Sequence, residues 1–326
     1  MKKNTEYNLS ATGLSNEELF SMVDHNELES EKITAPRYSY WRSVFRVFFN
    51  NRLNVFILSL LGFVILMAYV YPAIFDFDQY ANVLDPTTKH LTPTAAFERF
   101  GFSIHWLFGA GKSGEPTFDA IWFGSRVSIS LALVCAGINM SVGVIVGAIW
   151  GFSKKVDAVM NEVMNIVGNI PGTLFLAVMV MILKANFWTL VFALTITNWI
   201  FIAYAIRTQV VIIRDREYNL ASRCLGTSTF KITMKNILPF MTSYIVTLLA
   251  SEIPSYINAE IFISIIGLGI KDITLGRLLY EAENAMMVKG WGWEFWSPVF
   301  VAAIISVVLY VAGQNLGDAS DPRTHM

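Results

Sequence analysis

Charged and chemically reactive side chains are scarce in this chain of 326 residues. Aspartate, glutamate, lysine and arginine make up 15% of it, whereas hydrophobic residues make up 54%. A chain this apolar carries more hydrophobic surface than a soluble domain can bury, which excludes an ordinary soluble protein. The two cysteines, Cys135 in an apolar run and Cys224 in a basic segment, exclude a disulfide framework and a cysteine metal site.

Clustered histidines are also absent, which argues against a membrane enzyme. The four histidines are scattered over tails and loops, and none has the spacing of a metal ligand or a catalytic triad beside another candidate. The stretch from Gly109 to Ser113 ends like a nucleotide-binding P-loop, but Trp106 stands where the first glycine is required. We therefore expect no catalytic residues, no metal site and no cofactor bound by this chain.

Long apolar runs predict an all-α polytopic membrane protein. Runs of this length cross a hydrocarbon core of about 30 Å at about 1.5 Å per helical residue. The six expected spans are residues 54–74, 126–150, 158–183, 187–206, 240–262 and 297–316, within a transmembrane domain at 53–317. Extracellular loops are expected at 75–125 and 263–296, and a basic cytoplasmic loop at 207–239.

The segments outside the spans differ in character. Residues 1–37 form an acidic tail, in which Ser15 and Glu18 have the spacing of a capping box at the start of a short helix. Residues 38–52 predict an interfacial helix with Trp41, Phe45 and Phe48 on one face. Residues 318–326 form a short tail, and we expect no cleavable signal peptide because the chain starts with hydrophilic sequence.

The distribution of basic residues predicts the orientation. With the N-terminus inside, 16 of the 24 lysines and arginines fall on cytoplasmic segments. This excess fits the positive-inside rule for membrane proteins. We therefore expect both termini in the cytoplasm.

Two sets of residues within the spans stand out. Asn139, Gly143, Gly147 and Gly151 recur every four residues, a spacing typical of close helix packing in lipid. Polar residues deep in the third and fifth spans predict a face toward protein or a water-filled path, because ionisable groups are costly in hydrocarbon. These candidate pathway residues are Asn165, Asn169, Glu252, Asn258 and Glu260. Pairing with a polar neighbour and contact with cargo both remain open for them.

The segment at 207–239 predicts a helical projection from the membrane. Ala221, Cys224 and Leu225 form a narrow apolar stripe, and Gly226 can adopt the left-handed conformation that ends a helix. This segment resembles the cytoplasmic loop of permease subunits in binding-protein-dependent ABC importers, which reads roughly E-x-x-x-A-A-R-x-L-G and later I-L-P. The matching residues are Glu217, Ala221, Arg223, Leu225, Gly226 and Pro239, while Ser222 replaces the second alanine.

Flanking segments extend this resemblance over nearly all of the chain after residue 40. Asn51-Arg52-Leu53 resembles the start of the family's first span, and residues 260–269 resemble the E-x-x-L-S-F-L-G-L-G signature of its oligopeptide and dipeptide branch. Residues 318–323 resemble the ending D-A-L-D-P-R, with Gly317 in place of the usual preceding arginine. Residues 110–116 depart from the family segment that precedes the second span.

The resemblance implies a C-type permease of an oligopeptide importer with the type I, methionine-importer-like fold. It implies a bacterial plasma membrane location, a homologous second permease, two ATPase subunits that bind ATP and magnesium, and an extracellular binding protein that delivers peptide. The six matching residues of the 207–239 loop would then couple this chain to an ATPase. A dipeptide or nickel cargo stays open within the family. Outside it, the alternative is an ion-coupled secondary transporter with Glu252 and Glu260 as coupling carboxylates, although the internal repeats of such folds are missing.

Overall fold

The computed structural model describes residues 40–80 and 82–321. These residues are almost entirely helical, and the one strand-like contact among them is an isolated bridge between Ala110 and Pro116. The short helix predicted in the acidic tail at 1–37 lies outside the described residues, as do residues 322–326.

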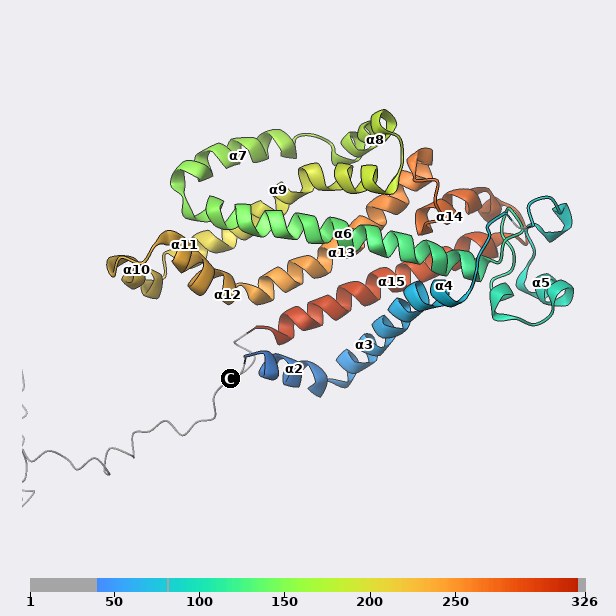
Figure 1. Cartoon of the computed structure of the whole chain (residues 1–326), viewed down its shortest axis with the longest axis horizontal. Coiled ribbons are helices and arrows are strands. Elements are labelled where there is room, and N and C mark those ends of the chain that lie inside the picture. The colour runs from blue at the N-terminus through green and yellow to red at the C-terminus, as the bar shows by residue number, and fades with distance from the viewer. Residues whose placement is uncertain (1–39, 81, 322–326) are drawn as a thin grey trace, which may run out of the picture. The chain divides into compact units, whose positions relative to one another are not determined.

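Helices account for every major element of the described chain (Figure 1). The first half contains α2 (Tyr40–Asn50), α3 (Arg52–Ile65), α4 (Tyr71–Ile74), α5 (Pro93–Phe100), α6 (Thr117–Phe152), α7 (Lys154–Gly168) and α8 (Gly172–Leu183). The second half contains α9 (Phe187–Arg214), α10 (Glu217–Cys224), α11 (Thr229–Ile232), α12 (Leu238–Phe240), α13 (Thr242–Ile263), α14 (Leu275–Ala282) and α15 (Gly292–Ala319).

Four of these helical segments are long and apolar enough to cross a membrane. They are Arg52–Ile74, Thr117–Phe152, Phe187–Arg214 and Gly292–Ala319. Two further pairs pass the same test together but are bent, Lys154–Gly168 with Gly172–Leu183 by 75° and Thr229–Phe240 with Thr242–Leu268 by 68°. The structure therefore supplies up to six spans, in line with the six apolar runs of the sequence.

The observed helices differ from the predicted spans at their ends. Helix α6 begins nine residues before the predicted second span, and α9 continues past the predicted end at residue 206 to Arg214. The predicted third span, 158–183, is interrupted rather than straight, because Pro171 stands between α7 and α8. Proline lacks a main-chain N–H and restricts the residue before it, so the helix cannot continue unchanged through this position.

Helix α6 packs closely against α9 through the small residues that recur along it. A Cβ added at Gly147 would lie 2.5 Å from the Ala203 oxygen, and one added at Gly151 would lie 2.7 Å from Val210 Cβ. Such contacts leave no room for a side chain, so these glycines permit the close approach of the two helices. The predicted packing face on this span is confirmed.

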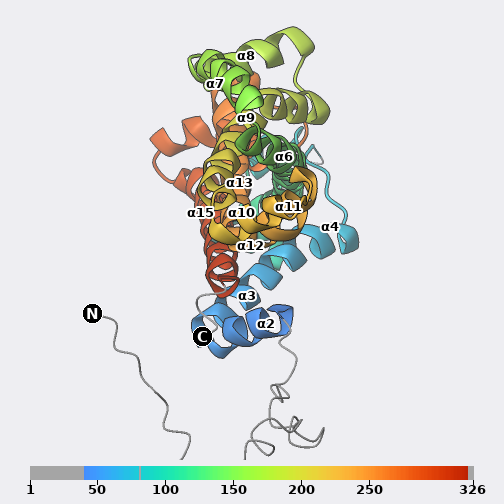
Figure 2. The same ribbon diagram turned by 90° about the vertical axis from the view of Figure 1, so that its left-hand side faces the viewer.

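Helices α13 and α15 form a second close pair. Gly313 and Gly317 of α15 face Ala250 and Thr247 of α13, and the Ser243 hydroxyl donates to the Gly317 oxygen at 2.7 Å. Figures 1 and 2 place α7 and α8 on one side of the bundle and α3 on the opposite side. Helices α6, α9, α13 and α15 lie between these two sides and contain most of the buried residues.

Helix α2 presents aromatic side chains at its surface. Trp41 and Phe45 are exposed, and Arg42 and Arg46 are exposed beside them, as an interfacial helix requires. Phe48, predicted on the same helical face, is only 5% exposed. Phe48 lies about 20° around the helix from Trp41, on the side of buried Val44, so the division between surface and interior falls between these positions.

The two ends of the bundle carry different elements. Helices α10, α11 and α12 gather at one end, which we call the α10 end, and α5, α14 and the 109–116 loop gather at the other, the α5 end (Figure 1). Helix α6 runs between the two ends, and its 36 residues span about 54 Å at about 1.5 Å per residue.

Candidate functional site

The predicted projection at the α10 end is a helix, a glycine turn and a second helix, as the sequence indicates. Helix α10 ends at Cys224, and Gly226 follows with a φ of 77°. The main-chain N–H of Thr227 donates to Ser222 O at 3.0 Å, and that of Gly226 donates to Arg223 O at 2.9 Å. These two bonds form a Schellman motif, which requires the left-handed conformation that glycine adopts without strain.

A buried asparagine attaches α10 to the membrane domain. Asn219 is completely buried, and its Nδ2 donates to Ile213 O at the end of α9 over 2.9 Å. Its Oδ1 accepts from Asn236 Nδ2 at 3.2 Å, which adds the segment before α12. In the sequence, this role of Asn219 is indicated only by its position, a polar residue on the side of α10 that faces away from solvent.

Arg223 attaches α10 to the end of α6 rather than pointing into solvent. Its guanidinium lies 4.7 Å from the centre of the Phe152 ring, and Nη2 donates to Arg214 O at 3.2 Å. Arg214 in turn donates from Nη1 to Gly151 O at 2.6 Å. Three elements, α6, α9 and α10, therefore meet at one cationic joint, which we call the Arg223 joint.

The other matching residues of α10 face outward. Glu217 lies exposed in the first turn, where a carboxylate is favoured by the helix dipole, and Ala221 is exposed one turn later. Leu225 is 85% exposed, and Gly226 has open space around it. Exposed apolar side chains are unusual on a solvated projection, and they continue with Tyr218, Leu220 and Phe230. We call the exposed residues of α10, together with Leu225 and Phe230, the knob surface.

Pro239 lies at the connection between the knob and the membrane domain. It is exposed within α12, at the 68° bend between Thr229–Phe240 and Thr242–Leu268. Pro239 therefore lies between the projection and the start of α13.

A second polar site lies about halfway along α13. Glu252 is the eleventh of the 22 residues of this helix, and it lines a cavity of about 230 Å³ with Asn198 of α9 and Ser255. The Tyr256 hydroxyl hydrogen-bonds to Glu252 and accepts from Asn139 Nδ2 of α6 at 2.5 Å. Asn139 is completely buried behind this cavity. We call this site the Glu252 cavity.

The remaining predicted pathway residues do not gather at this cavity. Asn258 is exposed on α13, Asn165 is exposed on α7, and Asn169 is exposed just after α7, where its Nδ2 donates to Asn165 O at 2.6 Å. Glu260 is completely buried. It cannot contact cargo in this conformation, so the structure does not place it on an open pathway.

Glu260 instead connects three helices near the α5 end. Its carboxylate accepts from Ser128 Oγ of α6 at 2.9 Å and from Ser264 Oγ at 2.9 Å. It also accepts from Thr274 Oγ1 at 2.6 Å and from Gly276 N at 3.3 Å at the start of α14. Four donors satisfy a buried carboxylate that would otherwise be strongly destabilising.

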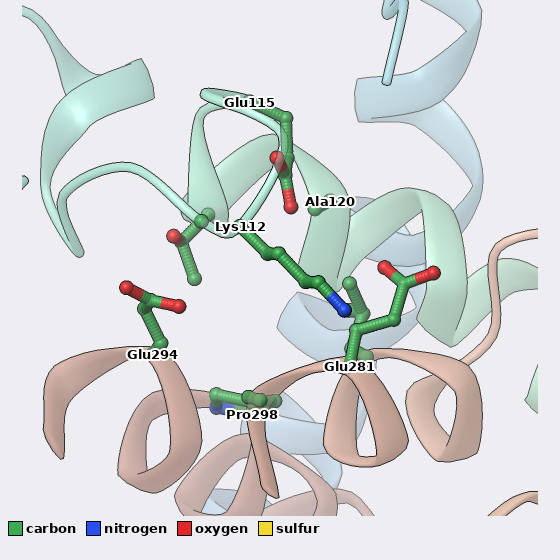
Figure 3. Close-up of a pocket in the computed structure, with 10 residues that line it drawn as sticks. Lys112, Glu115, Ala120, Glu281, Glu294 and Pro298 are labelled. Carbon is green, nitrogen blue, oxygen red and sulfur yellow. The ribbon is translucent and has the colours of Figure 1, made fainter. Parts of the chain in front are cut away.

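The P-loop-like stretch forms a closed turn at the α5 end. The main-chain N–H of Ser113 donates to Glu115 Oε2 at 2.7 Å, and that of Gly111 donates to Glu115 O at 2.9 Å. Glu115 therefore occupies the donors that a phosphate would need. The side chain of Lys112 extends from this turn toward Glu281 of α14, with Glu294 on the other side of a small cavity (Figure 3).

Polar clusters that sequence spacing could not reveal also lie at this end. Asp119 accepts from the Tyr71 hydroxyl at 2.5 Å, and its other oxygen lies 2.8 Å from His105 Nδ1. His90 Nδ1 lies 2.6 Å from Glu294 Oε1. These pairs join residues up to 204 positions apart and tie the loop before α6 to α4 and α15. Among the described residues, no group of histidine, cysteine, aspartate or glutamate could hold a metal ion.

Taken together, these features define a class. The helical membrane domain contains a polar cavity halfway along a span, and an exposed helix is attached at one end through the Arg223 joint. This combination is typical of a transporter subunit.

Comparisons with known proteins identify the family. Residues 143–326 match the family described as "Binding-protein-dependent transport system inner membrane component", and residues 39–93 match the "N-terminal TM domain of oligopeptide transport permease C". The chain belongs to this family of permease subunits of ABC importers.

Three relatives align with this chain over nearly their full length. The oligopeptide transport system permease protein AmiD of Streptococcus pneumoniae is 43% identical, over 94% of this chain and 98% of its own. The dipeptide permease DppC and the oligopeptide permease OppC of Bacillus subtilis are each 28% identical over 94% of this chain, and over 93% and 97% of their own lengths.

Proposed function

We propose that this chain forms half of the translocation pathway of an ATP-driven importer for oligopeptides, as the C-type permease of a bacterial plasma membrane complex. Its partners are a homologous second permease, two ATPase subunits that bind ATP and magnesium, and an extracellular binding protein that delivers the peptide. The names of the relatives support peptide cargo, and the 43% identity to AmiD favours oligopeptides over dipeptides or nickel complexes.

The observation that carries this proposal is the knob surface. Leu225 is 85% and Phe230 75% exposed on a projection that Asn219 and the Arg223 joint hold against the membrane domain. An exposed apolar surface on a firmly attached helix suits a groove on a partner protein. The α10 end then faces the cytoplasm, as the distribution of basic residues predicts, and the α5 end faces the binding protein.

The mechanism follows from how the knob is attached. ATP binding closes the ATPase pair, and α10 moves as a rigid body with it. The Arg223 joint passes this displacement to α6 and α9, and the bend at Pro239 passes it to α13. These spans switch from an inward-facing to an outward-facing arrangement, peptide enters from its binding protein, and hydrolysis reopens the pathway to the cytoplasm.

The alternative of an ion-coupled secondary transporter has less support. It needs carboxylates that exchange ions with an open pathway, but Glu260 is completely buried and engaged by four donors. Family membership also favours the ATP-driven reading. Uptake that survives ATP depletion and stops when the ion gradient collapses would favour the alternative.

The test replaces one exposed leucine at each end of the bundle. Leu225→Asp places a charge on the knob surface without disturbing the interior, and Leu84→Asp does the same at a leucine 93% exposed before α5. In the complete complex we expect Leu225→Asp to lose the ATPase subunits during purification and to lose ATP-driven uptake. Leu84→Asp retains the ATPase subunits. Full ATPase binding and uptake with Leu225→Asp would refute the proposal.

A further inference from the structure

Glu252 is an acidic group halfway along a membrane helix, and none of the ion pairs among the described residues includes it. It is the eleventh of the 22 residues of α13, about 15 Å from either end of that helix. An acidic residue at the centre of a membrane helix costs about 2.5–3.5 kcal/mol on insertion scales, so such residues are rare and mark functional sites.

The surroundings of Glu252 are arranged as a binding site and not as a packed interior. Its carboxylate is partly exposed and lines the Glu252 cavity of about 230 Å³ together with Asn198, Ser255 and Tyr256. This volume admits several water molecules or one small polar group. Asn198 and Ser255 add neutral hydrogen-bonding groups, while Phe201 and Ala259 complete an apolar rim.

A chain of hydrogen bonds fixes the carboxylate toward this cavity. The Tyr256 hydroxyl donates to Glu252, and it is held in turn by Asn139 Nδ2. Asn139 is completely buried in α6, and its Nδ2 also lies 3.4 Å from Leu194 O of α9. The carboxylate is thus supported from behind by neutral donors, and its open side lacks a positive charge.

We propose that the Glu252 cavity binds the positively charged amine of a peptide as it passes through the membrane. This inference rests on the proposed function, because peptides are the cargo that supplies the cation. Every unmodified peptide carries an ammonium group at its N-terminus, whatever its side chains, so one carboxylate can serve many sequences. Asn198 and Ser255 then accept or donate hydrogen bonds to the adjoining peptide group, which also recurs in every sequence.

The test compares two forms of one peptide in the complete, reconstituted importer with its binding protein. The two probes are an alanine-rich peptide with a free N-terminus and the same peptide N-acetylated. Each rate for a variant is divided by the wild-type rate for the same probe, so any preference of the binding protein cancels. We expect Glu252→Gln to slow uptake of the free-amine peptide about tenfold, which corresponds to about 1.4 kcal/mol. Uptake of the acetylated peptide is unchanged or faster.

A second variant restores the carboxylate from the other side of the cavity. Asn198→Asp in the Glu252→Gln background returns an acidic group to the same cavity, and we expect it to recover most of the free-amine uptake. Equal slowing of both probes by Glu252→Gln, or no effect on either, would overturn the inference. Neither result touches the proposed function, because Leu225→Asp then still removes uptake of both probes.

Discussion

The Arg223 joint gives the sharpest prediction about how the knob drives the spans. A cation–π contact such as that of Arg223 with Phe152 is worth about 0.5–2 kcal/mol, and a hydrogen bond from a charged donor about 1.5–3 kcal/mol. The Arg223 side chain is 36% exposed, so the lower ends apply and the joint contributes about 2 kcal/mol. The 3.9 Å approach to Asp215 adds little at an exposed position.

Loss of about 2 kcal/mol shifts the balance between an attached and a detached α10 about thirtyfold. We therefore expect Arg223→Ala to reduce peptide uptake per ATP hydrolysed while ATP hydrolysis itself continues, because the ATPase still moves α10 but α6 no longer follows. The assay measures both rates in the same proteoliposomes. Arg223→Lys keeps the charge but loses the planar group that stacks on Phe152, and it gives an intermediate ratio.

Two comparisons separate the joint from a general loss of charge. Lys231→Ala removes one positive charge from the neighbouring α11, where Lys231 is exposed, and it leaves the ratio at the wild-type value. Phe152→Leu lowers the ratio, and combining it with Arg223→Ala costs less than the sum of the single changes, because both remove one contact. If Arg223→Ala kept the wild-type ratio of peptide uptake to ATP hydrolysis, or if Arg223→Ala and Lys231→Ala changed it equally, the Arg223 joint would not transmit the motion of α10.

Further predictions concern the packing and the α5 end. Gly147→Ala lowers the melting temperature of the complex, because the added Cβ lies 2.5 Å from the Ala203 oxygen and such overpacking costs about 1–3 kcal/mol. Gly137→Ala on the same helix is the control: its Cβ has no neighbour within 4 Å, and the melting temperature stays unchanged. Glu260→Ala destabilises by at least about 1–3 kcal/mol, because the Gly276 N–H loses its acceptor, and stability equal to the wild type in a thermal melt would contradict this. Burial, with smaller contributions from Glu281 and Glu294, raises the pKa of Glu115 from 4.5 to about 7. The folded state therefore binds the Glu115 proton more tightly than the unfolded state does, so the contribution of Glu115 to stability is largest below about pH 4.5 and falls as the pH rises to about 7. Glu115→Gln removes this part of the pH dependence of the melting temperature.

Hydropathy and local sequence were sufficient for much of the fold. Apolar runs are the main requirement of a helix in lipid, so their positions indicate the spans directly. Gly226 adopts the left-handed conformation that was predicted for a glycine just after a helix. The glycines that recur every four residues, Gly143, Gly147 and Gly151, face α9 as predicted. Both features depend on residues within a few positions of each other, which a single sequence displays.

Features that depend on distant partners could not be predicted. For Glu260 the sequence left pairing with a polar neighbour and contact with cargo both open, and the structure shows it buried and bonded to donors from residues 128, 264, 274 and 276. The start of α6 at Thr117 was missed because the polar residue Asp119 interrupts the apolar pattern, and the contacts that accommodate it come from Tyr71 and His105. The roles of Asn219 and Phe152 likewise depend on helix ends that meet only in three dimensions.

Labelling of Cys224 shows whether an ATPase subunit binds α10, on which the proposed function depends. The chain has two cysteines, of which Cys135 is buried and Cys224 is exposed on α10, so a maleimide reports on the knob alone. We expect a membrane-impermeant maleimide to leave Cys224 unlabelled in intact cells and to label it in inside-out vesicles stripped of the ATPase subunits. Adding those subunits back is expected to block the labelling. Reaction from outside the cell, or equal reaction with and without the ATPase subunits, would contradict the proposed function.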